Sequence, residues 1–188
     1  YSALSDKKAL SYQFCKSDIA TRGSFNPNSY TEWFVESYSL WMTKQKYPDF
    51  FYCTEINTEI PYLYFGNSRY RNWKLLQYLE EINGTGFIDN LWKKADSIAD
   101  KKADQDVFSI IMHLSGMDRL QFGDLFAEFV FNNLKDLFNE QLKRCGIEEE
   151  KIQASRLTVL QLLDSTRNLY AVPIDAAPQP YGYNIIRL

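Results

Sequence analysis

Apolar and polar positions alternate along most of the chain with the period of an α-helix. Apolar residues recur at intervals of three and four, and glycines and prolines separate the periodic stretches. The pattern therefore predicts a mainly α-helical protein whose helices are joined by irregular segments. The predicted helices cover residues 4–18, 29–46, 69–83, 87–95, 104–114 and 120–144, and a short strand is predicted over 52–57.

The segment 29–46 differs from the other predicted helices because it is apolar on two faces. A helix that is apolar on more than one face is normally buried, so we expect this helix to be central. Ser29 and Glu32 have the spacing of a capping box at its start, and Pro48 stops it. One stripe consists of Tyr30, Phe34, Tyr38 and Trp41, and the other of Trp33, Ser37 and Leu40.

Glu36 lies in the middle of this apolar helix. It follows Trp33 by one turn and precedes Leu40 by one turn, so its carboxylate is expected to point into the buried region. A buried carboxylate is costly unless it contacts a cation, a metal or several hydrogen-bond donors. Two interpretations stay open: Glu36 is a metal ligand, or it belongs to a buried ion pair or hydrogen bonds to a helix N-terminus.

The last part of the chain has a different pattern. Residues 156–163 suit either a helix or a strand, and the prolines that follow predict a loop that is not helical. The run 183–188 favours a strand, either the first of a following β-domain or an edge strand on the helices. We therefore predict a helical domain over 1–150 and an extended, Pro-rich segment over 151–188.

Composition excludes several classes of protein. Of the 188 residues, 45% are hydrophobic and 16% aromatic, which favours a folded globule over a disordered chain. The formal net charge of −3 offers no basic surface for nucleic acid. The sequence contains no apolar run of about 18 residues, so no membrane span is expected. Cys15, Cys53 and Cys145 are too far apart in sequence to match a metal-ligand spacing, and their redox state stays open.

The segment Trp33-Phe34-Val35-Glu36-Ser37-Tyr38-Ser39 resembles the glutamate helix of gluzincin zinc metallopeptidases. In that family the glutamate is the third zinc ligand, and an earlier H-E-x-x-H helix supplies two histidine ligands and the general base. The resemblance implies a fold like the C-terminal half of a gluzincin, with Glu36 as a metal ligand. The motif is incomplete, because His113 is the only histidine. We therefore expect zinc in an intact parent protein but none in this chain alone.

The resemblance also implies a function. The closing segment 180–186 is similar to the exit segment of bacterial secreted members, which implies a secreted, periplasmic or cell-surface protein. The chain is then a fragment of a zinc metallopeptidase-like hydrolase, inactive alone, whose substrate is a peptide or protein, or a glycan. Adjoining domains are expected on both sides. The alternative is a non-catalytic helical module that binds a peptide, a glycan or a neighbouring domain.

Three further groups of residues have two interpretations each. Tyr64 and Tyr70 are candidates for the oxyanion-stabilising tyrosines that some gluzincins use, although core tyrosines are more common. Arg69 and Arg71 suit carboxylate binding or a solvated helix start. His113 lies in an apolar run, which favours a histidine in the core over a ligand or a base.

Overall fold

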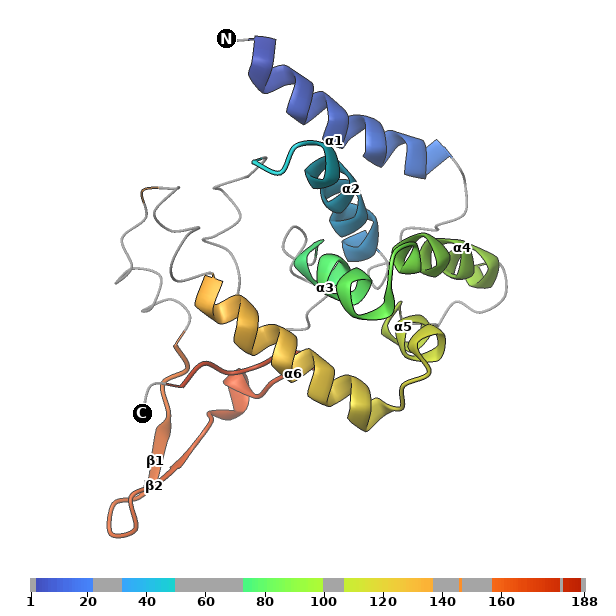
Figure 1. Ribbon diagram of the computed structural model, residues 1–188. Coiled ribbons are helices and arrows are strands. Elements are labelled where there is room, and N and C mark those ends of the chain that lie inside the picture. The colour runs from blue at the N-terminus through green and yellow to red at the C-terminus, as the bar shows by residue number, and fades with distance from the viewer. Residues whose placement is uncertain are drawn as a thin grey trace. The chain divides into compact units, whose positions relative to one another are not determined.

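The structure, a computed structural model, describes residues 3–21, 32–49, 73–99, 107–136, 146, 157–179 and 181–186. In these ranges the protein is mainly α-helical, as the sequence predicts, with one short two-stranded sheet near the C-terminus (Figure 1). None of the helices described is both long and apolar enough to cross a membrane. The helices are α1 (Ala3–Thr21), α2 (Glu32–Lys46), α3 (Trp73–Asn83), α4 (Phe87–Ala99), α5 (Val107–Ser115) and α6 (Arg119–Asp136).

The chain forms two compact units. The first comprises Tyr1–Tyr52 and Ser68–Val130, and it contains α1 to α5 and most of α6. The second comprises Cys53–Asn67 and Phe131–Leu188, and it contains the end of α6 and the β-structure. Glu36 and the side chains around it belong to the first unit.

Helix α2 is buried in the first unit, which confirms the prediction from its two apolar stripes. Trp33, Phe34 and Trp41 expose 1%, 0% and 8% of their surface. Trp33 stacks on Phe108 of α5 with 5.2 Å between the ring centroids, and Phe34 stacks on Trp92 of α4 at 5.6 Å. Such offset aromatic pairs add packing energy beyond the area that they bury. The two faces of α2 therefore contact different helices, and this fixes α2 at the centre of the unit.

A short turn joins α3 to α4, and a carboxylate from α3 stabilises it. Gly84 and Gly86 have φ values of +93° and +90°, which a residue with a Cβ atom rarely adopts. Across this turn the two carboxylate oxygens of Glu80 accept hydrogen bonds from the backbone N–H groups of Gly86, at 2.7 Å, and Ile88, at 3.1 Å. Glu80 therefore satisfies donors at the start of α4 that have no partner within that helix.

The connection from α5 to α6 is defined by local sequence in the same way. Gly116, with φ of +66°, ends α5. One carboxylate oxygen of Asp118 then accepts hydrogen bonds from the backbone N–H groups of Leu120 and Gln121, at 2.8 and 2.9 Å. The side chain of Gln121 in turn accepts the Asp118 N–H at 2.9 Å. This reciprocal arrangement is a capping box, and it begins α6 one residue before the predicted start.

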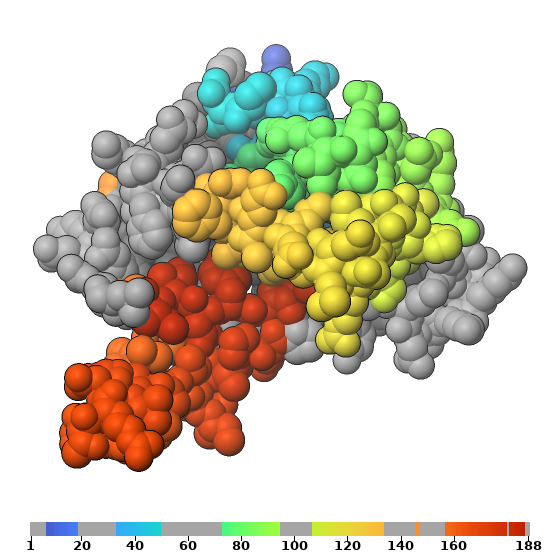
Figure 2. All heavy atoms as spheres, turned by 60° about the horizontal axis from the view of Figure 1, so that its bottom comes forward, coloured from blue at the N-terminus to red at the C-terminus, as the bar shows by residue number. Residues whose placement is uncertain are grey.

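The second unit contains an antiparallel hairpin of β1 (Gln161–Asp164) and β2 (Leu169–Ala171). Leu162 pairs with Tyr170, and an irregularity in register follows between Leu162 and Asp164. Figure 2 shows the hairpin in orange, with side chains of both strands at the surface. The expected β-prone run at the C-terminus does find a partner, because Ile185 forms a parallel bridge with Leu157.

The structure differs from the sequence analysis in two elements of the C-terminal part. The Pro-rich segment was expected to contain no helix, but Ile174–Ala176 forms one 3-10 turn, η4, after Pro173. Strand β2 was not predicted, because its three residues lie between turn residues and prolines. The buried stripe of α3 consists of Leu75, Leu76 and Leu79, whereas Ile82 is 44% exposed.

Several predicted features lie outside the described residues. They are the capping residue Ser29, the strand over 52–57, residues 137–144 of the last predicted helix, the candidate tyrosines Tyr64 and Tyr70, the arginines Arg69 and Arg71, and the cysteines Cys53 and Cys145.

Candidate functional site

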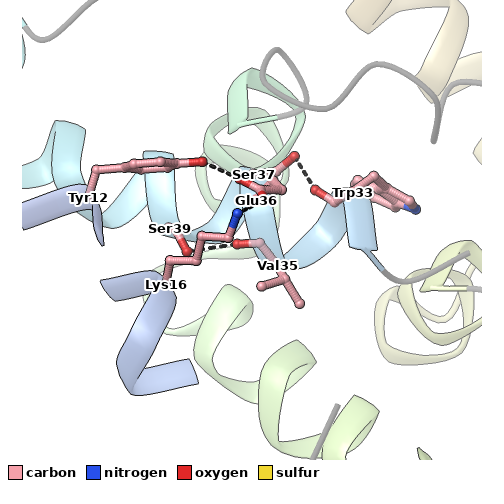
Figure 3. A network of polar contacts seen from close by, with 7 residues as sticks. All are labelled: Tyr12, Lys16, Trp33, Val35, Glu36, Ser37 and Ser39. Atoms are coloured by element: carbon pink, nitrogen blue, oxygen red, sulfur yellow. Dashed lines mark hydrogen bonds and ion pairs between the residues drawn. The ribbon is translucent and has the colours of Figure 1, made fainter. Parts of the chain in front are cut away.

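The candidate site is built where α1 lies across α2, around the carboxylate of Glu36 (Figure 3). Glu36 is only 4% exposed, as its position between Trp33 and Leu40 predicts. The helical period places Tyr12 and Lys16, four residues apart, on one face of α1, and both side chains point at Glu36. The site therefore combines one residue from the predicted motif with two residues from a helix that the sequence analysis assigned no function.

Each oxygen of the Glu36 carboxylate has its own partner. The buried Tyr12 hydroxyl donates a hydrogen bond to Oε2, and the Lys16 ammonium forms an ion pair and a hydrogen bond with Oε1. Hydrogen bonds to a charged acceptor are stronger than those between neutral groups, so both contacts offset the cost of burying the carboxylate. Of the two interpretations of Glu36, the structure contains the ion pair.

Three buried hydroxyl side chains lie on the same helix as Glu36. Ser37, Ser39 and Thr43 are all fully buried, and each hydroxyl donates to a carbonyl four residues earlier in the same helix, at 2.6 to 2.8 Å. These groups are therefore satisfied within α2.

Cys15 directly precedes Lys16 on α1, and its side chain is half-buried. Burial raises the pKa of its thiol above the ordinary value of 9.0, and the charge of Asp18 acts in the same direction. A hydrogen bond with the Thr43 side chain opposes the rise. The thiol is therefore protonated at neutral pH, which makes it a poor nucleophile and a poor metal ligand there.

The donors at Glu36 do not fit a zinc ion. Zinc in proteins is bound by thiolate, imidazole and carboxylate groups, and a catalytic site needs three such ligands. Around Glu36 the structure provides one carboxylate, one phenol and one ammonium, and an ammonium has no lone pair to donate to a metal. In the part of the chain described, no three His, Cys, Asp or Glu side chains lie close enough together to hold a metal ion.

The other candidates do not join this site. His113 is exposed on α5, so the expectation that it is a core histidine is wrong. The helical period explains the difference: Ile110 and Ile111 of the same run face the core, while His113 falls on the opposite side of a nine-residue helix. The structure does not describe Tyr64 or Tyr70.

Sequence reasoning missed Tyr12 and Lys16. The sequence analysis predicted the helix over 4–18 and singled out neither residue. Their four-residue spacing was a usable signal, because two polar side chains one turn apart reach the same point on a facing helix. The facing helix itself was not predictable from local pattern, so their common partner was missed.

Comparison with known proteins places the chain in a family. No curated protein and no solved structure matches it. Residues 8–188 match a family with the description "Family of unknown function (DUF6055)". The match covers α1 from Lys8 onward, so Tyr12, Lys16 and Glu36 all lie inside it. The chain belongs to the DUF6055 family.

Proposed function

We propose that this chain is a non-catalytic, metallopeptidase-like protein whose helical unit binds polypeptide. The observation that carries the proposal is the state of Glu36, whose two carboxylate oxygens are bound by Tyr12 and Lys16. A carboxylate in this state already has a cation at one oxygen and a hydrogen-bond donor at the other. This favours the non-catalytic alternative over a zinc hydrolase.

The position of α1 supports the same choice. In a gluzincin, the H-E-x-x-H helix packs against the side of the glutamate helix from which the glutamate side chain projects. In this structure α1 lies on that face, with Tyr12 buried to 4% exposure against it. An H-E-x-x-H helix from elsewhere in a longer chain could bring its imidazoles to Glu36 only after it had displaced α1. The contacts of Tyr12 and Lys16 with Glu36 would then be lost. The zinc peptidase therefore becomes the less favoured candidate.

An exposed apolar pair on α1 supports the binding role. Leu10 and Phe14 are 64% and 73% exposed. They lie one turn apart on the face of α1 opposite Tyr12, so they are not part of the contact with α2. Exposed apolar side chains that cluster mark interaction surfaces more often than single ones do. A polypeptide with apolar side chains suits this pair better than a glycan. As part of the proposal, we place the protein outside the cytoplasm, at the cell surface, in the periplasm or secreted.

The catalytic question is tested by zinc titration and a peptidase assay on the wild-type chain. We expect no zinc site tighter than micromolar, because Glu36 has no imidazole partners in this arrangement. We also expect no chelator-sensitive cleavage of an unfolded protein substrate. A stoichiometric nanomolar zinc site that disappears in Glu36→Gln overturns the proposal.

The binding role is tested by selection of displayed random peptides on the immobilised chain, with a glycan array run in parallel. We expect peptides with apolar side chains to be enriched on the wild type and not on Phe14→Ser. Gln13→Ser, an exposed neighbour on α1, serves as the matched control and should retain the enrichment. Enrichment that is unchanged in Phe14→Ser, or specific glycan binding instead, contradicts the assignment of this surface.

A further inference from the structure

The side of α1 that faces away from α2 carries a self-complementary row of side chains. Helix α1 packs on α2 through the side that contains Tyr12 (Figure 1). On the opposite side Leu10 and Phe14 are 64% and 73% exposed. Lys7 precedes Leu10 by one turn, and Asp18 follows Phe14 by one turn. Along α1 the row therefore consists of a cation, two apolar side chains and an anion.

The two charges of this row are not placed to stabilise α1 itself. The helix dipole favours anions in the first turn of a helix and cations in the last turn. In α1 the anion Asp18 lies in the last turn, which contains no basic residue, and the cation Lys7 lies in the N-terminal half. The order of the two charges therefore needs another reason than the stability of the helix.

We infer that the polypeptide bound by this surface is a second copy of the same chain, with the two α1 helices packed antiparallel. The inference rests on the proposed polypeptide binding and names the partner. In a twofold dimer the same surface serves on both copies, so each contact occurs twice. Leu10 of one copy then contacts the partner's Phe14, and Phe14 contacts the partner's Leu10.

The positions of the charges match an antiparallel pair. The midpoint of Leu10 and Phe14 is level with Tyr12 along the axis, so Lys7 lies five residues before it and Asp18 six residues after it. At 1.5 Å per residue these separations are about 8 Å and about 9 Å. The period of 3.6 residues also puts both charges on one edge of the row, about 60° and about 80° from Leu10 around the axis. An antiparallel twofold pair therefore brings Lys7 of each copy beside the partner's Asp18.

A second copy suits this row better than other arrangements do. Parallel copies form neither ion pair, because the two lysines come to one end and the two aspartates to the other. An unrelated peptide needs the same order of charges, whereas a second copy has it by symmetry. The exposed side chains of Gln13 and Ser17, on the other edge of the row, are uncharged and do not repel a second copy.

Sedimentation equilibrium under reducing conditions tests for the dimer. One helix face is smaller than a standard interface, so we expect a dissociation constant on the order of 10 to 100 μM. At about 1 μM, where unfolding is measured, the chain is then monomeric. Phe14→Ser and, as a second probe, Leu10→Gln should each weaken the dimer about tenfold or more, and Gln13→Ser should change it by less than about twofold. A wild type that stays monomeric, or a dimer that is unchanged in Phe14→Ser, overturns the inference.

Charge reversal tests the antiparallel arrangement. Lys7→Glu should weaken the dimer about fivefold, because like charges then meet at both ends. Asp18→Lys should do the same, and a weaker helix is not the cause, since the dipole favours a cation in the last turn. The double variant Lys7→Glu/Asp18→Lys should restore the wild-type affinity, and so should a mixture of the two single variants. Absence of this rescue overturns the inference.

The outcomes separate the dimer from the proposed function. The changed side chains lie on the side of α1 away from α2, so each variant should keep the helical circular dichroism of the wild type. Peptide enrichment that depends on Phe14, without a dimer, overturns the inference but leaves the polypeptide-binding function in place. A tight zinc site that depends on Glu36 overturns the proposed non-catalytic function instead, and the sedimentation result does not depend on it.

Discussion

Lys16 and Glu36 form an ion pair whose two ends differ in exposure: 43% of the Lys16 side chain is accessible to solvent, but only 5% of the Glu36 side chain. Water can therefore replace the carboxylate as the partner of the lysine, but it cannot replace the lysine as the partner of the carboxylate. Loss of the anion and loss of the cation should for this reason have different consequences.

Glu36→Gln should lower the free energy of unfolding by about 1 kcal/mol, the size expected for a pair with one exposed end. The amide keeps the shape of the side chain, its oxygen still accepts from Tyr12, and Lys16 turns to water. Glu36→Ala, which removes a buried side chain and the acceptor of the Tyr12 hydrogen bond, should cost about 3 kcal/mol. Urea unfolding measures both. A loss above 3 kcal/mol for Glu36→Gln is incompatible with a lysine that reaches solvent.

Lys16→Met should cost more than Glu36→Gln, about 2 kcal/mol, because it leaves a buried carboxylate without its cation. Adding Glu36→Gln to Lys16→Met should then recover part of the stability, so the double-mutant cycle is non-additive. Lys7→Met, an exposed lysine of the same helix, is the matched control and should change stability by less than about 0.5 kcal/mol. Additive losses in the cycle contradict the ion pair.

Cys15 should react slowly with iodoacetamide in the native protein. Burial raises the pKa of its thiol above 9.0, so at pH 8 the thiolate fraction is smaller than in the unfolded chain. The native alkylation rate should keep rising with pH beyond 9, where the urea-unfolded rate has begun to level off. Mass spectrometry of the Cys15 peptide follows both rates separately from the other cysteines. Equal native and unfolded rates at pH 8 rule out this environment.

The folded thiol of Cys15 binds its proton more tightly than the unfolded thiol does, and this gives the sign of a pH effect on stability. Below pH 8 both forms are protonated and the group makes no difference. As the pH rises through the unfolded pKa, the unfolded state ionises first, so the free energy of unfolding declines. Cys15→Ser should therefore make the stability fall less steeply between pH 8 and 10, as measured by melts at each pH. An unchanged slope of stability against pH contradicts a raised pKa of Cys15.

Glu80→Ala should destabilise the protein by about 1 to 2 kcal/mol, because two backbone N–H groups at the start of α4 lose the charged carboxylate that accepts their hydrogen bonds. Glu81→Ala is a close control: the neighbouring glutamate is exposed and accepts only a hydrogen bond from Gln77 in the contacts described. It should change stability by less than about 0.5 kcal/mol. Thermal melts of the two variants should separate clearly, and similar melts argue against capping by Glu80.

The sequence predicted the helices well because their patterns are local. The two apolar stripes of residues 29–46 indicated a buried helix, and the structure buries Trp33 and Phe34 almost completely. Helix ends were predicted to within a few residues where glycines mark them, as at Gly84 and Gly116. Strand β2 was missed because a three-residue strand is stabilised by its partner across the hairpin, and that partner is not visible in local pattern.

The candidate site was predicted in part. The burial of Glu36 followed from its position on a helix with two apolar faces, but its partners depended on which helix lies across α2. Tertiary packing decides which helix lies across α2, and the local pattern of a single sequence does not predict it. His113 shows the opposite error: the composition of its surroundings suggested burial, although its angular position on α5 exposes it.

The buried hydroxyls of α2 determine which property of these positions evolution has to keep. The hydroxyls of Ser37, Ser39 and Thr43 donate hydrogen bonds to backbone carbonyls of α2 itself. These side chains therefore need no hydrogen-bond acceptor from a neighbouring helix. Volume, rather than hydrogen-bonding capacity, is then the property that these positions must conserve. Over evolutionary time they should exchange freely among alanine, serine, cysteine and threonine while excluding leucine and phenylalanine. The sequence of α2 can therefore vary at these three positions while the packing around the helix is kept.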